Sequence, residues 1–349
     1  MSEEIYIVNQ DVKIFGWQRL KTVRTMDSLC GSFELSYVGN DDIKSVLTGF
    51  EPIQLYLGEK LLMTGYIFPV KIPIVNDKNM IVIVGREKTA DLIDCSAINK
   101  PGTWRNQTLQ QIIFALVQPF GINVQTIVDT GDVFTKFSIN HGEPVVNAIY
   151  RACNLRGVLP ITDEYGDLLL TSASSLEASE PVKYGENILS GEYIYDYTES
   201  YSNYFVAGNT ITAGAGWGSK SKINVIGEAE DTTIGRYRPF YVKDSDRVTK
   251  KDVRNKAAWM AQVRYGNASN LEINLSSYFQ SNGDRWSPNL MVPVEIPLAD
   301  IDTELLITQV EYTHSQNLQN CKLTIKDPLV YKQEPQPTIK KTVNSGWSL

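Results

Sequence analysis

The chain has 349 residues, of which 42% are hydrophobic and 21% charged, and its formal net charge is -7. The length predicts two or three domains, and the composition is that of a soluble globular protein, which excludes a disordered or membrane-spanning chain. No apolar run approaches the roughly 18 to 20 residues that span a bilayer, and the start, MSEEIYIVNQD, lacks the basic and apolar stretches of a signal peptide. We expect synthesis in the cytoplasm and no direct membrane insertion.

The acidic balance argues against a dedicated nucleic-acid-binding surface, because phosphate neutralisation needs clustered Lys and Arg. Two short basic runs exist, KKDVRNK from Lys250 and IKK from Ile339. One falls in a predicted helix and the other in the tail, so we interpret both as solvated faces rather than as a DNA footprint.

Cysteine and histidine usage argues against a metal or redox centre. The two histidines, His141 and His314, stand alone, which leaves little for a zinc site or for His-based acid/base catalysis. The cysteines have no CxxC spacing and occupy apolar or small-residue contexts, so they are expected to be buried free thiols. They are Cys30, Cys95, Cys153 and Cys321. We expect no cofactor.

Residues 1–97 form a series of short apolar or alternating runs separated by turn residues, which is typical of a small antiparallel β-barrel or sandwich. The expected strands are 4–8, 12–15, 18–24, 32–38, 52–57, 61–68, 70–75 and 80–85.

Residues 98–174 change to an α/β pattern. Thr108 and Gln111 form a capping box at the start of a helix that ends before Pro119. A second helix opens at Pro144, and the sequence DEYGD then predicts a hairpin between 158–162 and 167–171. The inward residues are expected to be Leu109, Ile112, Ile113, Leu116 and Val117 in the first helix, and Val145, Ile149, Ala152 and Cys153 in the second.

Strand patterns return in 175–328, which we predict to be a second β-barrel domain with one helix at 250–265 ending at Gly266. Residues 172–186 are polar and turn-rich and are expected to be a linker, and 329–349 a flexible C-terminal tail. The expected strands are 188–197, 201–207, 222–226, 271–278, 290–297, 304–314 and 320–325. The fold class is therefore mainly β with an α/β insert, with two small antiparallel barrels flanking a two-helix domain.

A junction is predicted where the strand Ile81–Val84 breaks at Gly85 and enters a compact turn. The turn contains neither a nucleophile beside a base nor a cluster of metal ligands, so its charges are expected to join two domains by paired hydrogen bonds. We assign structural importance to Gly85, Arg86, Lys88, Asp91 and Asp94.

The run GREKTADLIDCSA at Gly85–Ala97, then PGTWRNQTL and a short helix ending in PFGI, resembles the Mu-type phage tail protein P family, the late control D-like baseplate hub of contractile tails. The resemblance extends from about Tyr6 to about Pro328. It implies a virion structural protein, with kinship to type VI secretion spike proteins. It further implies a homotrimer whose barrels form a pseudo-six-fold ring between tail tube and trimeric spike, with neighbouring baseplate contacts and a bore for DNA passage without specific binding.

Two further patterns have plain structural interpretations. The loop AGAGWGSKS at Ala213–Ser221 fails the Walker spacing, because Gly218 is followed by Ser219 before Lys220. Asp300, Asp302 and Glu304 alternate as a calcium site or an acid/base pair would require, but no Gly-bearing calcium loop surrounds them, so we expect an exposed acidic turn.

Tyrosines are concentrated between Tyr184 and Tyr204. A rigid, amphipathic ring suits a protein interface, ordinary sheet packing or stacking on sugars, and the sequence leaves these alternatives open. The candidate interface residues are Tyr193, Tyr195, Tyr197 and Tyr201. The function predicted is a non-enzymatic baseplate hub with no catalytic residues. The alternatives are a tail-associated cell-wall hydrolase and a carbohydrate-binding adhesion module.

Overall fold

The computed structural model describes residues 4–38, 52–74, 80–173, 176–213, 220–244, 249–315 and 318–336. The chain divides into two compact units. The larger comprises Met1–Ile194 and Asn270–Pro328, and the smaller comprises Tyr195–Ser269 and Leu329–Leu349. The four-domain division by sequence stays a prediction.

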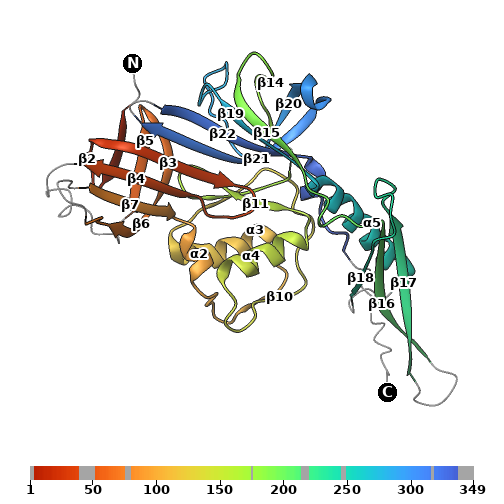
Figure 1. Cartoon of the computed structure of the whole chain (residues 1–349). Helices are drawn as coiled ribbons and strands as arrows, with labels where there is room; N and C mark the ends of the chain where they lie inside the picture. The colour runs from red at the N-terminus through yellow and green to blue at the C-terminus, as the bar shows by residue number, and fades with distance from the viewer. Residues whose placement is uncertain are drawn as a thin grey trace. The chain divides into compact units, whose positions relative to one another are not determined.

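The larger unit is built on one extended sheet, whose strand order is β15-β19-β22-β21-β3-β4-β7-β6-β5-β1-β2 (Figure 1). Buried and less buried residues alternate along most strands, as the two-residue period of a strand requires. The strands are β1 Ile5–Asn9, β2 Val12–Ile14, β3 Trp17–Thr25, β4 Ser32–Val38, β5 Pro52–Leu57, β6 Lys60–Lys71, β7 Met80–Glu87, β15 Ile188–Tyr195, β19 Ser269–Leu275, β20 Leu290–Ile296, β21 Ile301–Ser315 and β22 Leu318–Lys326.

The prediction of a mainly β chain with an α/β insert is confirmed. The expected pair of barrels takes a different form, because β3 pairs antiparallel with β21 and so joins the N-terminal and C-terminal strands in one sheet. Within the described ranges this path ends at β2 and β15 and forms no closed barrel. The pairing satisfies backbone groups that two separate sheet edges would expose. One continuous core lies between the strands of both sequence regions.

The segment expected to be a linker, 172–186, is partly structured. Its short strands β13 Leu176–Glu177 and β14 Val182–Lys183 pair in parallel with β20. Val182 is fully buried in the main core. The local sequence is polar and rich in turn residues, but a partner strand more than a hundred residues away supplies the hydrogen bonds and the apolar contact.

The α/β insert contains α2 Ala90–Asp94, α3 Leu109–Val117 and α4 Val145–Asn154, with α3 and α4 beside each other (Figure 1). Every residue expected to face inward on α3 and α4 is buried, and the Thr108–Gln111 capping box is present. The DEYGD hairpin is also confirmed. The insert's strands are β8 Thr103–Trp104, β9 Val124–Thr126, β10 Phe137–Ser138, β11 Leu159–Thr162 and β12 Leu168–Thr171.

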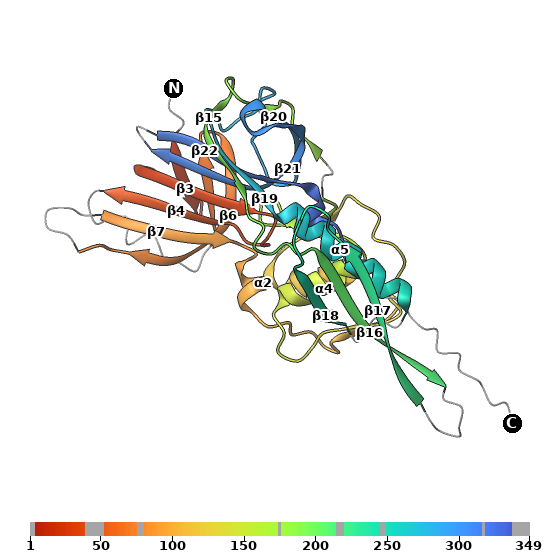
Figure 2. The same ribbon diagram turned by 45° about the vertical axis from the view of Figure 1, so that its right-hand side comes forward.

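The smaller unit has a three-stranded sheet covered by α5 Lys250–Asn267 (Figure 2). Helix and sheet approach closely at Gly227, where an added Cβ would lie 2.3 Å from backbone atoms of Val253 and Arg254. Gly266 lies within the helix rather than ending it. The strands are β16 Asn203–Ala213, β17 Lys220–Glu230 and β18 Pro239–Lys243, and β18 was not predicted.

Candidate functional site: a buried carboxylate junction and the cavity beside it

Strand β7 does not break at Gly85, as the sequence suggested, but continues to Glu87. Gly85 pairs with Phe33 of β4 on one side and with Ile67 of β6 on the other. A Cβ at this position would lie 2.0 Å from the Phe33 ring. The glycine therefore makes room for an aromatic ring inside a continuous strand.

The centre of the junction is Glu87, a carboxylate whose side chain is only 1% exposed. Its Oε1 lies 2.9 Å from Nε of Arg24 on β3. Its Oε2 accepts hydrogen bonds from the Gly31 amide at 2.8 Å and from the Thr162 hydroxyl at 2.9 Å. The Arg24 guanidinium also donates to the Thr162 carbonyl on β11. A buried charge requires such pairing, so this network fastens the α/β insert to β3, to β7 and to Gly31, the residue before β4.

The predicted junction residues lie around this network. Arg86 Nη1 donates to Asp94 Oδ2 at 2.7 Å, joining the end of β7 to α2. Lys88 donates to the Gly121 carbonyl and lies 3.9 Å from Asp167, both in the α/β insert. Burial, and then repulsion from Asp94, raises the pKa of Asp91 despite the opposing effect of Arg86.

Glu87 itself was missed by the sequence analysis. A signal was available, because Glu87 shares a strand face with Gly85 and Ile83 once β7 is allowed to continue through the glycine. Because the strand was expected to end at Gly85, Glu87 was placed outside it and its inward-facing side chain was not predicted.

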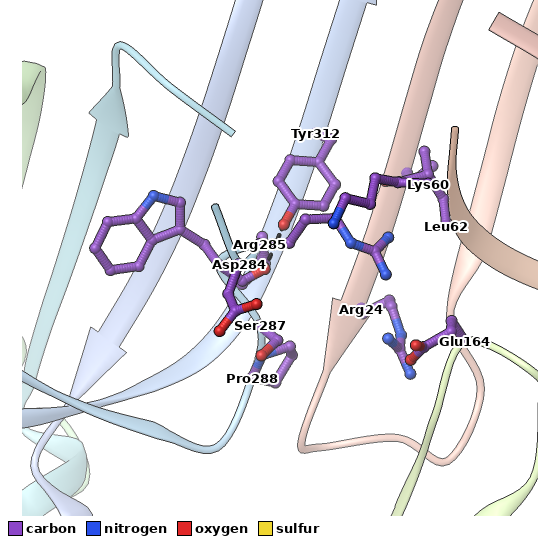
Figure 3. A pocket seen from close by; sticks show the side chains of 12 residues that line it. Arg24, Lys60, Leu62, Glu164, Asp284, Arg285, Ser287, Pro288 and Tyr312 are labelled. Carbon is purple, nitrogen blue, oxygen red and sulfur yellow. Dashed lines mark hydrogen bonds between the residues drawn. The ribbon is translucent and has the colours of Figure 1, made fainter. Parts of the chain in front are cut away.

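A cavity of about 300 Å³ lies beside the junction (Figure 3). Arg24 from β3 and Lys60 from β6 line it together with Arg285 from the loop between β19 and β20. Glu164 from the β11–β12 hairpin and Asp284 are the carboxylates in its lining. The cavity thus collects charges from four separate segments of the larger unit.

The loop that carries Arg285 is held against the sheet. The buried Tyr312 hydroxyl of β21 donates to the carbonyl of Trp286, and Trp286 is 2% exposed. Burial lowers the pKa of Arg285, and the smaller influences of Tyr312 and Glu164 oppose that effect. The guanidinium remains charged at neutral pH, since arginine does not deprotonate in proteins.

The four candidate interface tyrosines are not equivalent. Tyr193 packs against the main core. Tyr195 and Tyr197 are 57% and 48% exposed, and their rings stack with centroids 6.4 Å apart. Tyr201 is half-buried, with the guanidinium groups of Arg238 and Arg264 over its ring at 5.0 and 5.2 Å. Of the four candidates, Tyr195 and Tyr197 are therefore the two with exposed rings.

The prediction of four buried thiols is wrong for two of them. Cys153 and Cys321 are buried, whereas Cys95 is exposed and Cys30 is partly exposed. Cys95 follows the last residue of the short helix α2, where no further turn covers it. In the described part of the chain, no group of three or more His, Cys, Asp and Glu residues is arranged to hold a metal ion.

The remaining candidates do not assemble a site. Asp302 and Glu304 lie exposed on β21, and Asp300 ends a short 3₁₀ helix with φ of 53°. Of the glycine-rich loop, residues 214–219 lie outside the described residues. No helix among those described is long and apolar enough to cross a bilayer.

Comparison with known proteins identifies relatives across most of the chain. A family model described as baseplate hub protein gp44-like, second domain, matches residues 89–172. Another, described as Mu phage baseplate assembly protein GpP, fourth domain, matches residues 249–334. The baseplate hub protein gp44 of Escherichia phage Mu is 32% identical over 311 residues, which cover 86% of this chain and 81% of gp44.

Solved structures share the fold. The 43 kDa tail protein of prophage MuSo2 from Shewanella oneidensis superposes with a TM-score of 0.82 at 24% identity, covering 94% of this chain and 99% of that one. The tail protein from Neisseria meningitidis MC58 gives a TM-score of 0.79 at 18% identity, covering 96% and 99%. Both of these proteins are described as tail proteins. The chain accordingly belongs to the Mu-type baseplate hub family and has a structural hub role in the phage tail baseplate.

Proposed function

We propose that this hub is a homotrimer, forming a ring that joins the tail tube of a contractile phage to the trimeric membrane-piercing spike and lets DNA pass through its bore. In this proposal the chain is assembled into the tail in the bacterial cytoplasm. The role is mechanical. In a three-chain ring with pseudo-six-fold symmetry, each rigid β-sheet surface contacts a neighbour that is similar to itself but not identical.

The observation that carries the proposal is the extent of the match to the Mu hub protein, which is 32% identical over 311 residues. A match of this length includes both compact units rather than one module. Related chains of this family that share both units are expected to assemble in the same way.

The tyrosine pair supports a protein interface. Tyr195 and Tyr197 present two stacked and largely exposed rings on one short segment. Tyrosine supplies large contact area at low cost in side-chain entropy and is enriched at interfaces. We assign Tyr195 and Tyr197, rather than Tyr193 or Tyr201, to subunit contact.

The charge distribution supports passage of DNA through the bore without specific binding. The chain is acidic, and part of the basic run on α5 is neutralised locally. Lys256 lies 2.6 Å from Asp244 and 3.1 Å from Glu334. A bore lined by such a protein would not retain a polyanion electrostatically.

The mass in solution tests the proposal. Light scattering after size exclusion should give a species near three times 39.2 kDa. The double variant Tyr195→Ser, Tyr197→Ser should shift this species toward the monomer, whereas Tyr165→Ser, a similarly exposed tyrosine on the β11–β12 hairpin, should not. An unchanged trimer in the double variant would refute the assigned interface, and a monomeric wild type at all concentrations would count against a self-assembling ring.

A further inference from the structure

The cavity beside the junction contains one cation that is both partly buried and not directly paired. Arg285 is partly buried, and no ion pair or side-chain hydrogen bond from its guanidinium is found among the described residues. Arg24, by contrast, is already committed to Glu87 and to the Thr162 carbonyl. Burying a cation away from water costs free energy unless an anion compensates it.

Lys60 adds a second cation without a carboxylate partner in the described part of the chain. Figure 3 shows the Lys60 and Arg285 side chains extending into the same space from opposite sides. Like charges placed together repel, but Lys60 is exposed to solvent, which weakens this repulsion, and Glu164 attracts Arg285 from the same cavity. The Ser287 hydroxyl also lines the cavity and is available as a donor.

We infer that this cavity is a binding site for a small tetrahedral oxyanion of the phosphate class, held between the Arg285 guanidinium and the Lys60 ammonium. A guanidinium presents parallel N–H donors that match two oxygens of a phosphate, and an ammonium adds a compact point charge. The inference does not depend on the trimeric ring and assigns the chain a ligand site of its own.

The carboxylates of the cavity limit what binds. Glu164 and Asp284 line the same space and repel any anion. Their presence favours a small ion over a nucleic-acid strand and predicts weak binding, with a dissociation constant of about 1 mM. A bound oxyanion would connect β6 to the loop between β19 and β20, and so stabilise the larger unit.

Thermal unfolding of the full chain in increasing inorganic phosphate tests the inference, with sodium chloride at matched ionic strength as reference. Phosphate should raise the unfolding temperature in a saturable way that chloride does not reproduce. Arg285→Gln should weaken phosphate binding by roughly tenfold or more, since it removes a charge-assisted pair. Arg105→Gln, an exposed arginine in the α/β insert, is the matched control and should respond as wild type does.

A second variant, Asp284→Asn, tests the site without removing Arg285 and so does not depend on whether Arg285→Gln folds. Asp284→Asn removes a repelling carboxylate at the exposed rim and should tighten phosphate binding, measured by calorimetry on the folded protein. An equal phosphate response in wild type and Arg285→Gln would overturn the inference. So would a wild-type response no larger in phosphate than in chloride, or no tightening in Asp284→Asn.

Discussion

Removing the Glu87 carboxylate should destabilise the larger unit more than any surface substitution. Glu87→Ala removes the ion-pair partner of Arg24 and leaves the Gly31 amide and the Thr162 hydroxyl without their acceptor. Breaking a buried ion pair from one side costs about 3–5 kcal/mol. The separate contributions agree, because two hydrogen bonds to a charged group are worth about 1.5–3 kcal/mol each.

Urea unfolding should be followed by hydrogen exchange in peptides of β7 and β11. Because the chain has two compact units, a single spectroscopic midpoint would mix their transitions. Glu59→Ala, in the exposed turn before β6, is the control and should change stability by no more than about 0.5 kcal/mol.

A double-mutant cycle with Arg24→Ala separates the ion pair from the loss of packing. The double variant should be less destabilised than the sum of the single variants, with a coupling of at least about 1.5 kcal/mol. A coupling near zero, or a Glu87→Ala effect no larger than that of Glu59→Ala, would refute the reasoning that the buried carboxylate fastens the insert.

Three further predictions concern other parts of the chain. Gly85→Ala should lower the free energy of unfolding in urea by about 1–3 kcal/mol, because the new Cβ would clash with the Phe33 ring. The control Gly235→Ala, whose Cβ would have no atom within 4 Å, should change it little, and equal effects of the two substitutions would contradict the packing argument. Burial lowers the pKa of His314 below its ordinary 6.5, so the unfolded chain binds the proton more readily and stability falls as the pH drops below about 6.5. His314→Asn should lose this acid-side decline, and identical pH profiles of the urea midpoint would exclude it. Cys95 is exposed and should react rapidly with a maleimide in the native protein. Cys30, whose pKa is raised to about 11 by burial, and the buried Cys153 should react slowly. Mass spectrometry of the labelled peptides identifies the thiol that has reacted, and rapid labelling of Cys153 would contradict its burial.

Local periodicity was sufficient to predict the α/β insert. Leu109 and Ile113 recur at helical spacing, and Thr108 supplies its own cap, so the information for α3 lies within ten residues. The DEYGD hairpin is equally local. Such elements are fixed by neighbouring residues, and the structure confirms them.

Features that depend on distant partners could not be predicted in this way. Gly85 looks like a strand end until Phe33 occupies the space above it. Val182 lies in a polar stretch and becomes a strand residue only because β20 lies alongside. The Glu87 network joins four segments, and the pairing of β3 with β21 joins the two ends of the chain. No local pattern encodes these long-range pairings.

Cryo-electron microscopy of intact phage tails that carry this chain is the decisive experiment for the hub role and for the ring. We expect three copies arranged around an axial channel, between the tail tube and the spike, with Tyr195 and Tyr197 at the contact between neighbouring copies. Absence of the chain from the baseplate, or a position away from the tail axis, would contradict the hub role, and a copy number other than three would contradict the proposed ring.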